Sequence, residues 1–170
     1  MMEDVLKNIK VVVMDVDGVL TDGRIIVDSN GVETKNFDVQ DGFGIVFLKK
    51  CGLKTAIISA RESGVVAHRA RDLKIDHVYV GVYPKLNAYL SMLEEFQVQD
   101  EEVCFIGDDL VDLSIMRRCG FSFAVANAVF EVKQMADFVT ARKGGHGAVR
   151  EAIELILKAQ GQWGPQLYEH

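Results

Sequence analysis

Two aspartates at the end of an apolar run are the residues of this chain best suited to chemistry. Asp15 and Asp17 follow the β-branched segment 11–13, and Gly18 comes directly after them. The segment predicts a strand buried on both faces, and the i, i+2 spacing points both carboxylates to one side of an extended chain. Two carboxylates about 4 Å apart repel by roughly 4 kcal/mol at an effective dielectric of about 20. A cation, a shared proton or a polar substrate would relieve this repulsion, whereas a solvated strand end is the alternative without function.

Further polar side chains stand where other strands are expected to end or helices to begin. They are Ser59, Lys85 and the acids Asp108, Asp109 and Asp112. Carboxylates, a hydroxyl and an ammonium together suit a phosphate bridged to a hard cation such as Mg²⁺. Each residue alone has a plainer interpretation, because a serine at a strand end is usually a turn residue and a lysine at a helix start is usually solvated. Their combination and order make the pattern specific.

The elements that must position these residues alternate between strand and helix. Beyond the first strand, apolar runs predict strands over residues 55–59, 77–80, 103–107, 121–126 and 138–140. Helical patterns cover residues 63–73, 85–96, 109–119, 129–136 and a final stretch from 148 to 157. This alternation predicts an α/β fold with a doubly wound parallel sheet and helices on both faces. Ligands bind such sheets beyond the carboxyl ends of the strands, so the polar residues above are expected to meet in one site.

A hairpin is expected directly after the first strand. Asn30-Gly31 lies between two β-prone runs, which is a strong hairpin signal. We expect the hairpin, about residues 23–37, to stand out from the strand tip above the aspartates. Residues 38–44 are expected to form a loop that leads into a helix, which Gly52 closes.

The length and composition favour one folded domain. The 170 residues are 49% hydrophobic and 26% charged, and we expect a single domain over residues 1–160 with a loose tail over 161–170. A net charge of −6 gives no reason to expect a nucleic-acid partner. No apolar run suits a membrane span or a signal peptide, and Cys51, Cys104 and Cys119 are interpreted as buried thiols. We therefore expect a cytoplasmic protein.

The motifs taken together resemble those of the haloacid dehalogenase superfamily of phosphohydrolases. The likeness covers nearly the whole chain and rests on Asp15-x-Asp17-Gly18, Ile57-Ile58-Ser59, Lys85 and Gly107-Asp108-Asp109-x-x-Asp112. The resemblance implies the superfamily's α/β fold without a separate cap domain. It also implies that Asp15 is the nucleophile, which forms an aspartyl-phosphate, and that Asp17 protonates the leaving alkoxide and then activates water.

The same resemblance implies Mg²⁺ as cofactor. Asp15, the main-chain carbonyl of Asp17 and Asp108 would bind the ion, which lets an anionic nucleophile approach an anionic phosphate. Ser59 and Lys85 would bind the phosphoryl oxygens. The residues that would orient Lys85 or metal-bound waters are Asp109 and Asp112. Ala60 departs from the usual pattern, since relatives more often carry glycine there.

Within the superfamily the chain looks like the sugar-acid phosphatases that act on 3-deoxy-D-manno-octulosonate 8-phosphate in lipopolysaccharide precursor synthesis. The features are the short hairpin, Asp41-Gly42 in the following segment, and the ending Gly144-Gly-x-Gly-Ala-Val-Arg-Glu151. This likeness implies that Arg61 and Arg69 contact the carboxylate of the sugar acid. Phosphatases of nine-carbon sugar acids (2-keto-3-deoxynononate or N-acylneuraminate 9-phosphate) are the alternative, against which Arg61 and Asp72 argue. His146 either approaches a substrate hydroxyl or is a plain loop residue.

The likeness also implies a homotetramer in which hairpins assemble and neighbouring subunits cover each site. Apolar hairpin residues fit such an interface, although they could instead pack against the protein's own sheet; they are Ile25, Ile26, Val27, Val32 and Phe37. Two other classes of function stay open. A receiver domain of phospho-signalling uses similar residues in the reverse arrangement, and a non-catalytic oligomerisation module is disfavoured by the intact acids and lysine.

Overall fold

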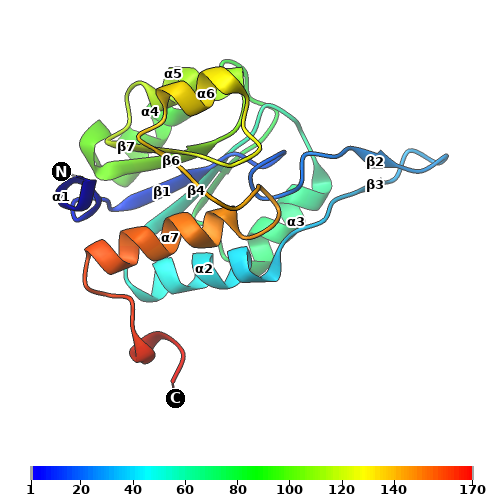
Figure 1. The fold of residues 1–170 in the computed structure, drawn as a ribbon. Coiled ribbons are helices and arrows are strands. Elements are labelled where there is room, and N and C mark those ends of the chain that lie inside the picture. Colours follow the sequence, from blue (N-terminus) through cyan, green and yellow to red (C-terminus); the bar gives the residue numbers. More distant parts are fainter. Residues whose placement is uncertain (1, 170) are drawn as a thin grey trace.

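A computed structural model describes residues 2–169 of the chain. Six parallel strands form one sheet in the order β5-β4-β1-β6-β7-β8, with β1 between β4 and β6. Helices α2, α3 and α7 cover one face and α4, α5 and α6 cover the other (Figure 1). The predicted doubly wound α/β fold is therefore confirmed. The strands of the sheet are β1 (Val11–Met14), β4 (Lys54–Ile58), β5 (His77–Tyr79), β6 (Val103–Gly107), β7 (Phe121–Ala124) and β8 (Phe138–Val139).

The helices other than α1, which was not predicted, lie close to their predicted positions. The helices are α1 (Met2–Leu6), α2 (Val39–Lys50), α3 (Gly64–Asp72), α4 (Lys85–Phe96), α5 (Leu113–Met116), α6 (Phe130–Met135) and α7 (Ala148–Ala159), with 3₁₀ helices η1 (Asp100–Glu102), η2 (Leu110–Asp112) and η3 (Pro165–Leu167). The expected helix over 109–119 is thus shorter and begins as η2. No helix among residues 2–169 is long and apolar enough to cross a bilayer.

The core lies on both sides of β1, where all four residues are fully buried. A central parallel strand is covered by helices on both faces, so each of its side chains must be apolar. The predicted apolar stripe of α7 is confirmed, since all six of its residues are fully buried: Ala148, Val149, Ala152, Ile153, Ile156 and Leu157. Cys104 is fully buried, whereas Cys51 and Cys119 are only half-buried.

Helix α2 begins earlier than expected, and the predicted loop over 38–44 is wrong. Asp38 caps the helix by accepting hydrogen bonds from the main-chain N–H groups of Gln40 and Asp41. Glycines 42 and 44 lie inside the helix because neighbours approach them closely. A Cβ on Gly42 would lie 2.6 Å from a guanidinium nitrogen of Arg69. Glycine disfavours a helix by propensity alone, but here Gly42 allows α3, and Gly44 allows α7, to pack tightly against α2.

Helix α4 is rotated relative to the face that its leucines suggested. Of the expected residues, Leu86, Leu93 and Phe96 are partly buried against the core, whereas Leu90 is 38% exposed. The fully or nearly buried residues are instead Lys85, Ala88, Tyr89 and Met92, at the i, i+3, i+4 and i+7 positions. The face is rotated because Lys85 itself must point into the protein.

The expected hairpin is present and projects from the body of the protein (Figure 1). Its strands β2 (Ile26–Val27) and β3 (Glu33–Thr34) are antiparallel, and a bridge between Thr21 and Phe37 closes its base. Ile25 and Val32 are 63% and 58% exposed, while Phe37 packs against the core. The suggestion that these apolar residues cover the protein's own sheet therefore holds for Phe37 alone.

The described part of the tail is not loose. Residues 165–167 form η3, and Leu167 is 4% exposed. The ring of Trp163 lies 5.8 Å from that of Phe47 on α2, so this part of the tail packs against the helix. Position 170, the last residue of the predicted tail, lies outside the described residues.

Candidate active site

The carboxyl ends of β1, β4 and β6 meet at one cavity of about 170 Å³. Because β1 runs between the other two strands, their tips lie side by side and bring together motifs far apart in the sequence. The cavity collects most of the predicted site residues. Its lining is Asp15, Asp17, Ser59, Ala60, Arg61, Lys85, Asp108, Asp109 and Val111.

Lys85 is the buried cation of this cavity. Its side chain is 1% exposed, and its Nζ lies 2.8 Å from Asp15 Oδ1 and 2.7 Å from Asp112 Oδ1. Burial disfavours the ammonium, but the two carboxylates outweigh burial and hold the pKa of Lys85 above its usual value. The lysine therefore stays charged and fixes the direction of Asp15.

Asp112 uses both of its carboxyl oxygens within the protein. Oδ1 accepts from Lys85, and Oδ2 accepts from the main-chain N–H of Asp108 at 3.0 Å and, at 3.3 Å, from that of Asp109. One carboxyl oxygen of each of Asp15, Asp108 and Asp112 lies within 4.8 Å of the others, a spacing that suits a metal ion. Since its oxygens are already bonded, Asp112 is better suited to position Lys85 and Asp108 than to bind the ion.

Asp108 has one carboxyl oxygen that lacks a partner among the described residues. Its Oδ1 is buried without a hydrogen bond. Burial, followed by the charges of Asp15 and Asp112, raises the pKa of Asp108 to about 8. Burial and the charge of Asp112 likewise raise the pKa of Asp15 to about 7, in spite of Lys85. Two buried acids with raised pKa values, one of them with an oxygen that lacks a hydrogen bond, are a natural ligand set for a hard cation.

The local charge fits a divalent ion. Three carboxylates (Asp15, Asp108, Asp112) and one ammonium (Lys85) sum to −2 when all are ionised. Gly18 makes room for this arrangement, with φ at +94°, because a Cβ there would collide with the carboxyl group of Asp108. The residues present therefore fit Mg²⁺, which takes a few carboxylate oxygens and completes its shell with water and phosphate oxygens.

Ser59 lines the cavity and is 2% exposed. Its Oγ accepts a weak hydrogen bond of 3.4 Å from the main-chain N–H of Arg61, which leaves its hydroxyl hydrogen available to an anion. Asp109, by contrast, is exposed and caps η2 by accepting from Leu110 N at 2.7 Å. Asp109 thus does not orient Lys85, one of the two roles expected for it.

The two arginines expected at the substrate carboxylate lie in different places. Arg61 lines the cavity, with Nη1 3.8 Å from Asp17 Oδ2. Arg69 does not line it: its guanidinium lies 5.7 Å from the centre of the Phe37 ring, and its Nε is buried without a partner. Asp72 is exposed at the end of α3. Of the two arginines, only Arg61 lines the cavity of its own chain.

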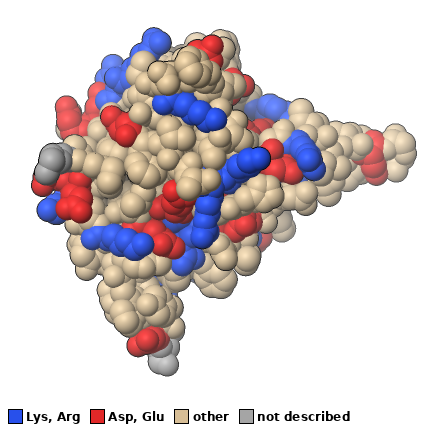
Figure 2. Space-filling model, in the orientation of Figure 1, with Lys and Arg blue, Asp and Glu red and all other residues tan. Residues whose placement is uncertain are grey.

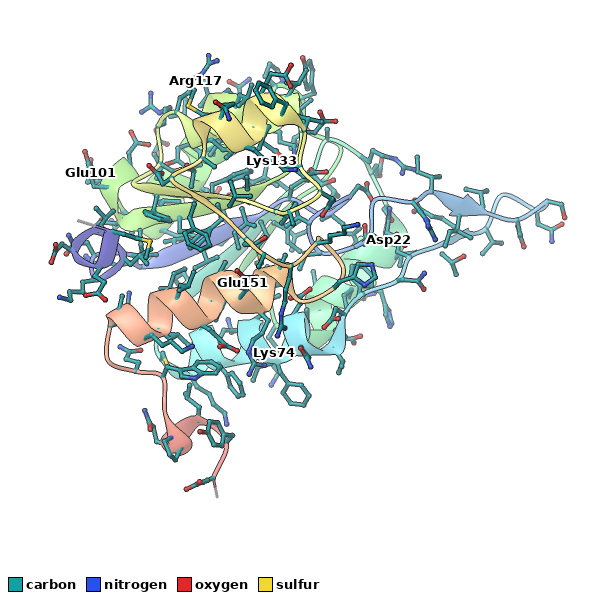
Figure 3. All side chains as sticks on the ribbon, viewed as in Figure 1. Asp22, Lys74, Glu101, Arg117, Lys133 and Glu151 are labelled. Atoms are coloured by element: carbon teal, nitrogen blue, oxygen red, sulfur yellow. The ribbon has the colours of Figure 1, made fainter. Side chains whose placement is uncertain are left out.

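His146 lies apart from this cavity. It lines a separate surface pocket with Asp22, Arg24, Asn127, Lys143 and Gly144. Figure 3 shows Asp22 at the base of the hairpin, on the side of the loop before α7. The structure therefore favours the interpretation of His146 as a loop residue within its own subunit.

Two charged hairpin residues near the site were missed by the sequence analysis. Lys35 Nζ lies 2.5 Å from Asp17 Oδ1, and Glu33 binds both Lys35 and Arg61. Glu33, Lys35 and Phe37 alternate along the returning strand, so they share one side of it. Phe37 pairs with Thr21, which lies four residues after Asp17. The alternation of Glu33 and Lys35 with Phe37 was therefore the sequence signal that could have placed these two charged residues near Asp17.

Comparison with known proteins agrees with this geometry. A family model described as haloacid dehalogenase-like hydrolase matches residues 74–153. The 3-deoxy-D-manno-octulosonate 8-phosphate phosphatase KdsC of Haemophilus influenzae is 43% identical over 161 residues, which are 95% of this chain and 89% of that protein. The chain belongs to the haloacid dehalogenase-like hydrolases.

Solved structures of this hydrolase family superpose closely on the chain. The 3-deoxy-D-manno-octulosonate 8-phosphate phosphatase of Moraxella catarrhalis, crystallised with magnesium, phosphate and KDO, is 44% identical with a TM-score of 0.92 over 94% of this chain and 92% of that one. The cobalt-bound phosphatase of Haemophilus influenzae is 41% identical with the same TM-score, over 98% and 96%. The superfamily resemblance of the motifs is thereby confirmed.

Proposed function

We propose that this hydrolase is a Mg²⁺-dependent phosphatase that removes phosphate from 3-deoxy-D-manno-octulosonate 8-phosphate (KDO 8-phosphate), a cytoplasmic step of lipopolysaccharide precursor synthesis. The observation that carries the proposal is the meeting of Asp15, Lys85 and the unpartnered Asp108 at adjoining strand tips. The 43% identity to KdsC and the KDO and magnesium bound by the Moraxella relative support the choice of substrate and ion.

The reaction proceeds in two displacements at phosphorus. An oxygen of Asp15 attacks phosphorus and the bond to the sugar oxygen breaks, while Asp17 gives its proton to the departing alkoxide. Asp17 then takes a proton from water as that water attacks the aspartyl-phosphate, which releases phosphate and restores Asp15. Lys85 and Ser59 hold phosphoryl oxygens throughout.

Asp15, the main-chain carbonyl of Asp17 and Asp108 would hold Mg²⁺. The ion supplies positive charge that shields the nucleophile from the phosphate oxygens. Asp112 keeps the main chain at Asp108 in place through its bonds to two N–H groups, and it shares Lys85 with Asp15. The acids thus keep their spacing before the ion arrives.

Arg61 is the residue of this chain that can recognise the carboxylate of the sugar acid. It lines the cavity and is held by Glu33 at 3.1 Å. An arginine fork suits a carboxylate through paired hydrogen bonds. Arg69 contributes to recognition only if it serves the cavity of a neighbouring subunit, because in its own chain it lies against the ring of Phe37 and does not line the cavity. A nine-carbon sugar-acid phosphate is the alternative substrate.

The exposed hairpin supports a homo-oligomer, which we propose is a tetramer. The hairpin carries few charged side chains beyond its base (Figure 2), and Ile25, Val27 and Val32 are all more than half exposed. Apolar protrusions of this kind are characteristic of interfaces between subunits. The double substitution Ile25→Glu and Val32→Glu is expected to yield monomers by light scattering, whereas an unchanged mass would contradict assembly through the hairpin.

The decisive test is a panel of phosphomonoesters assayed with and without Mg²⁺. Eight- and nine-carbon sugar-acid phosphates and neutral sugar phosphates are compared by kcat/KM. We expect KDO 8-phosphate to be the best substrate and chelation to abolish turnover. A higher kcat/KM for a nine-carbon sugar-acid phosphate would show that this compound, and not KDO 8-phosphate, is the substrate. Turnover that survives chelation would contradict the proposed dependence on Mg²⁺.

A further inference from the structure

Lys35 has an unusual environment for a lysine on a protruding hairpin. Its side chain is only 1% exposed, although its neighbours in sequence lie at the surface. Burying a lysine costs both hydration and side-chain freedom, so a lysine at the root of a hairpin normally extends into water. The position of Lys35 therefore has to be explained by what its ammonium contacts.

The ammonium of Lys35 contacts two carboxylates. It lies 2.5 Å from Asp17 Oδ1 and 3.1 Å from Glu33 Oε1. Glu33 is in turn fixed by Ser63, whose hydroxyl donates to Oε2 at 2.6 Å, and by Arg61 at 3.1 Å. The hairpin is thus tied to the start of α3 through Glu33, the second carboxylate that contacts Lys35.

This arrangement leaves Asp17 with one oxygen committed and one oxygen in the cavity. Oδ1 accepts from Lys35, while Oδ2 has Arg61 at 3.8 Å, beyond a normal hydrogen bond. A carboxyl group that must give a proton to a leaving oxygen needs a fixed direction, since proton transfer requires hydrogen-bond contact. Lys35 supplies that direction by holding the far oxygen.

We propose that Lys35 is a positioning residue for the acid–base step, through which the hairpin of the same subunit completes the catalytic site. The inference rests on the proposed function of Asp17 as general acid. It assigns the hairpin a role in the chemistry of its own subunit, separate from any role in assembly.

The test compares leaving groups that differ in their need for a proton. A sugar alkoxide needs protonation to depart, whereas p-nitrophenolate leaves without it. The variants are Lys35→Met, which removes the charge at similar volume, and Lys35→Arg, which restores it. For Lys35→Met we expect kcat/KM to fall about 10- to 100-fold for KDO 8-phosphate and by less than about 3-fold for p-nitrophenyl phosphate. Lys35→Arg should recover most of the loss.

A double-mutant cycle checks that the effect passes through Asp17. With Asp17→Asn already in place, Lys35→Met should lower kcat/KM for KDO 8-phosphate no further, because the two residues act as one unit. Equal losses with both leaving groups, or losses that multiply in the double variant, would overturn the inference. If Lys35→Met fails to fold by circular dichroism, Lys35→Leu, which also removes the donor and the charge, takes its place in the same comparisons.

A matched control is available at the same hairpin base. Arg24 is also a cation there, but its side chain is 82% exposed and its ion pair with Asp22 is long, at 3.9 Å. Arg24→Met should leave the ratio of the two kcat/KM values unchanged. If Arg24→Met changed this ratio as much as Lys35→Met does, the effect of Lys35 would be explained by the charge of the hairpin and not by its contact with Asp17. If the wild type hydrolyses no sugar-acid phosphate at all, the proposed function fails, and the comparison proceeds with any alkyl phosphate that it does cleave.

Discussion

Lys85 joins Asp15 and Asp112 through one buried ammonium, at 2.8 Å and 2.7 Å. Asp15 follows β1 and Asp112 ends η2, so the first residue of α4 links the two segments that carry the acids. A buried charge with two opposite partners is costly to disturb, because removing one partner leaves the others uncompensated. Asp15, the proposed nucleophile, is therefore held by a residue that is also expected to bind the substrate.

Asp112→Asn tests this linkage. The amide cannot accept from Lys85 and from the two main-chain N–H groups as strongly as the carboxylate does, so Lys85 and Asp108 should both lose alignment. We expect kcat to fall about 10- to 100-fold, as measured by phosphate release. The control is Asp109→Asn, because asparagine also caps a helix and Asp109 is exposed. Equal losses in both variants would argue against a specific role for Asp112.

Asp15→Asn and Asp17→Asn separate the two catalytic steps. Asparagine at position 15 is too weak a nucleophile, so phosphate release should drop to background. At position 17 it prevents proton transfer and should slow turnover about 10²- to 10⁴-fold. Rapid-quench measurement of phosphoenzyme with wild-type protein provides the direct readout. Hydrolysis by Asp15→Asn at the wild-type rate would contradict the covalent mechanism.

Magnesium affinity is expected to depend on pH. Without an ion, burial and neighbouring acids raise the pKa of Asp15 to about 7 and that of Asp108 to about 8. Below these values the ion must displace protons, and above them it need not. Affinity measured by calorimetry should therefore increase from pH 6 to pH 8 and then level off. Asp108→Asn should bind the ion weakly and with less pH dependence, and a flat wild-type profile would contradict protonated acids.

Asp41 makes a separate prediction about stability. It lies on α2, is 1% exposed, and accepts from the main-chain N–H of Arg150 on α7 at 2.7 Å. Burial raises its pKa to about 6 from 3.8. Because the folded state binds this proton more tightly than the unfolded state, the group's contribution to stability is present below pH 4 and is lost as pH rises through 6.

Asp41→Asn removes that titration and keeps an acceptor for Arg150. The free energy of unfolding of the variant relative to the wild type should rise between pH 4 and pH 7.5 by about 3 kcal/mol, which corresponds to a shift of about two pKa units. Urea unfolding at the two pH values measures it. If the free energy of unfolding of the variant relative to the wild type were the same at both pH values, Asp41 would not titrate in this range.

Arg61→Ala and Arg69→Ala distinguish recognition within one subunit from recognition across subunits. Arg61→Ala should raise KM for KDO 8-phosphate about 10-fold or more and affect p-nitrophenyl phosphate much less. Arg69→Ala should do the same only in an oligomer, so it is compared in the wild-type background and in the hairpin double variant. If Arg69→Ala raised KM equally in monomers, Arg69 would have to reach its own cavity.

The sheet and the cavity were predictable because their determinants are local. Unbroken apolar runs mark buried parallel strands, and the edge rule then places Asp15, Ser59 and Asp108 together. The start of α2 was missed because the requirement for Gly42 comes from Arg69 on another helix. The face of α4 was missed because Lys85 is drawn inward by two acids. Contacts of this kind join residues distant in sequence and leave no periodic pattern.

The lack of a side chain at Gly18 restricts how this chain can evolve. Any other residue would have to adopt a backbone angle of +94° and would collide with the carboxyl group of Asp108. A substitution at this position would therefore displace the carboxyl group of Asp108 from Asp15, while most of the core would stay intact. A homologue with a larger residue at this position is expected to keep the fold as an inactive descendant, which makes position 18 a compact marker of surviving activity.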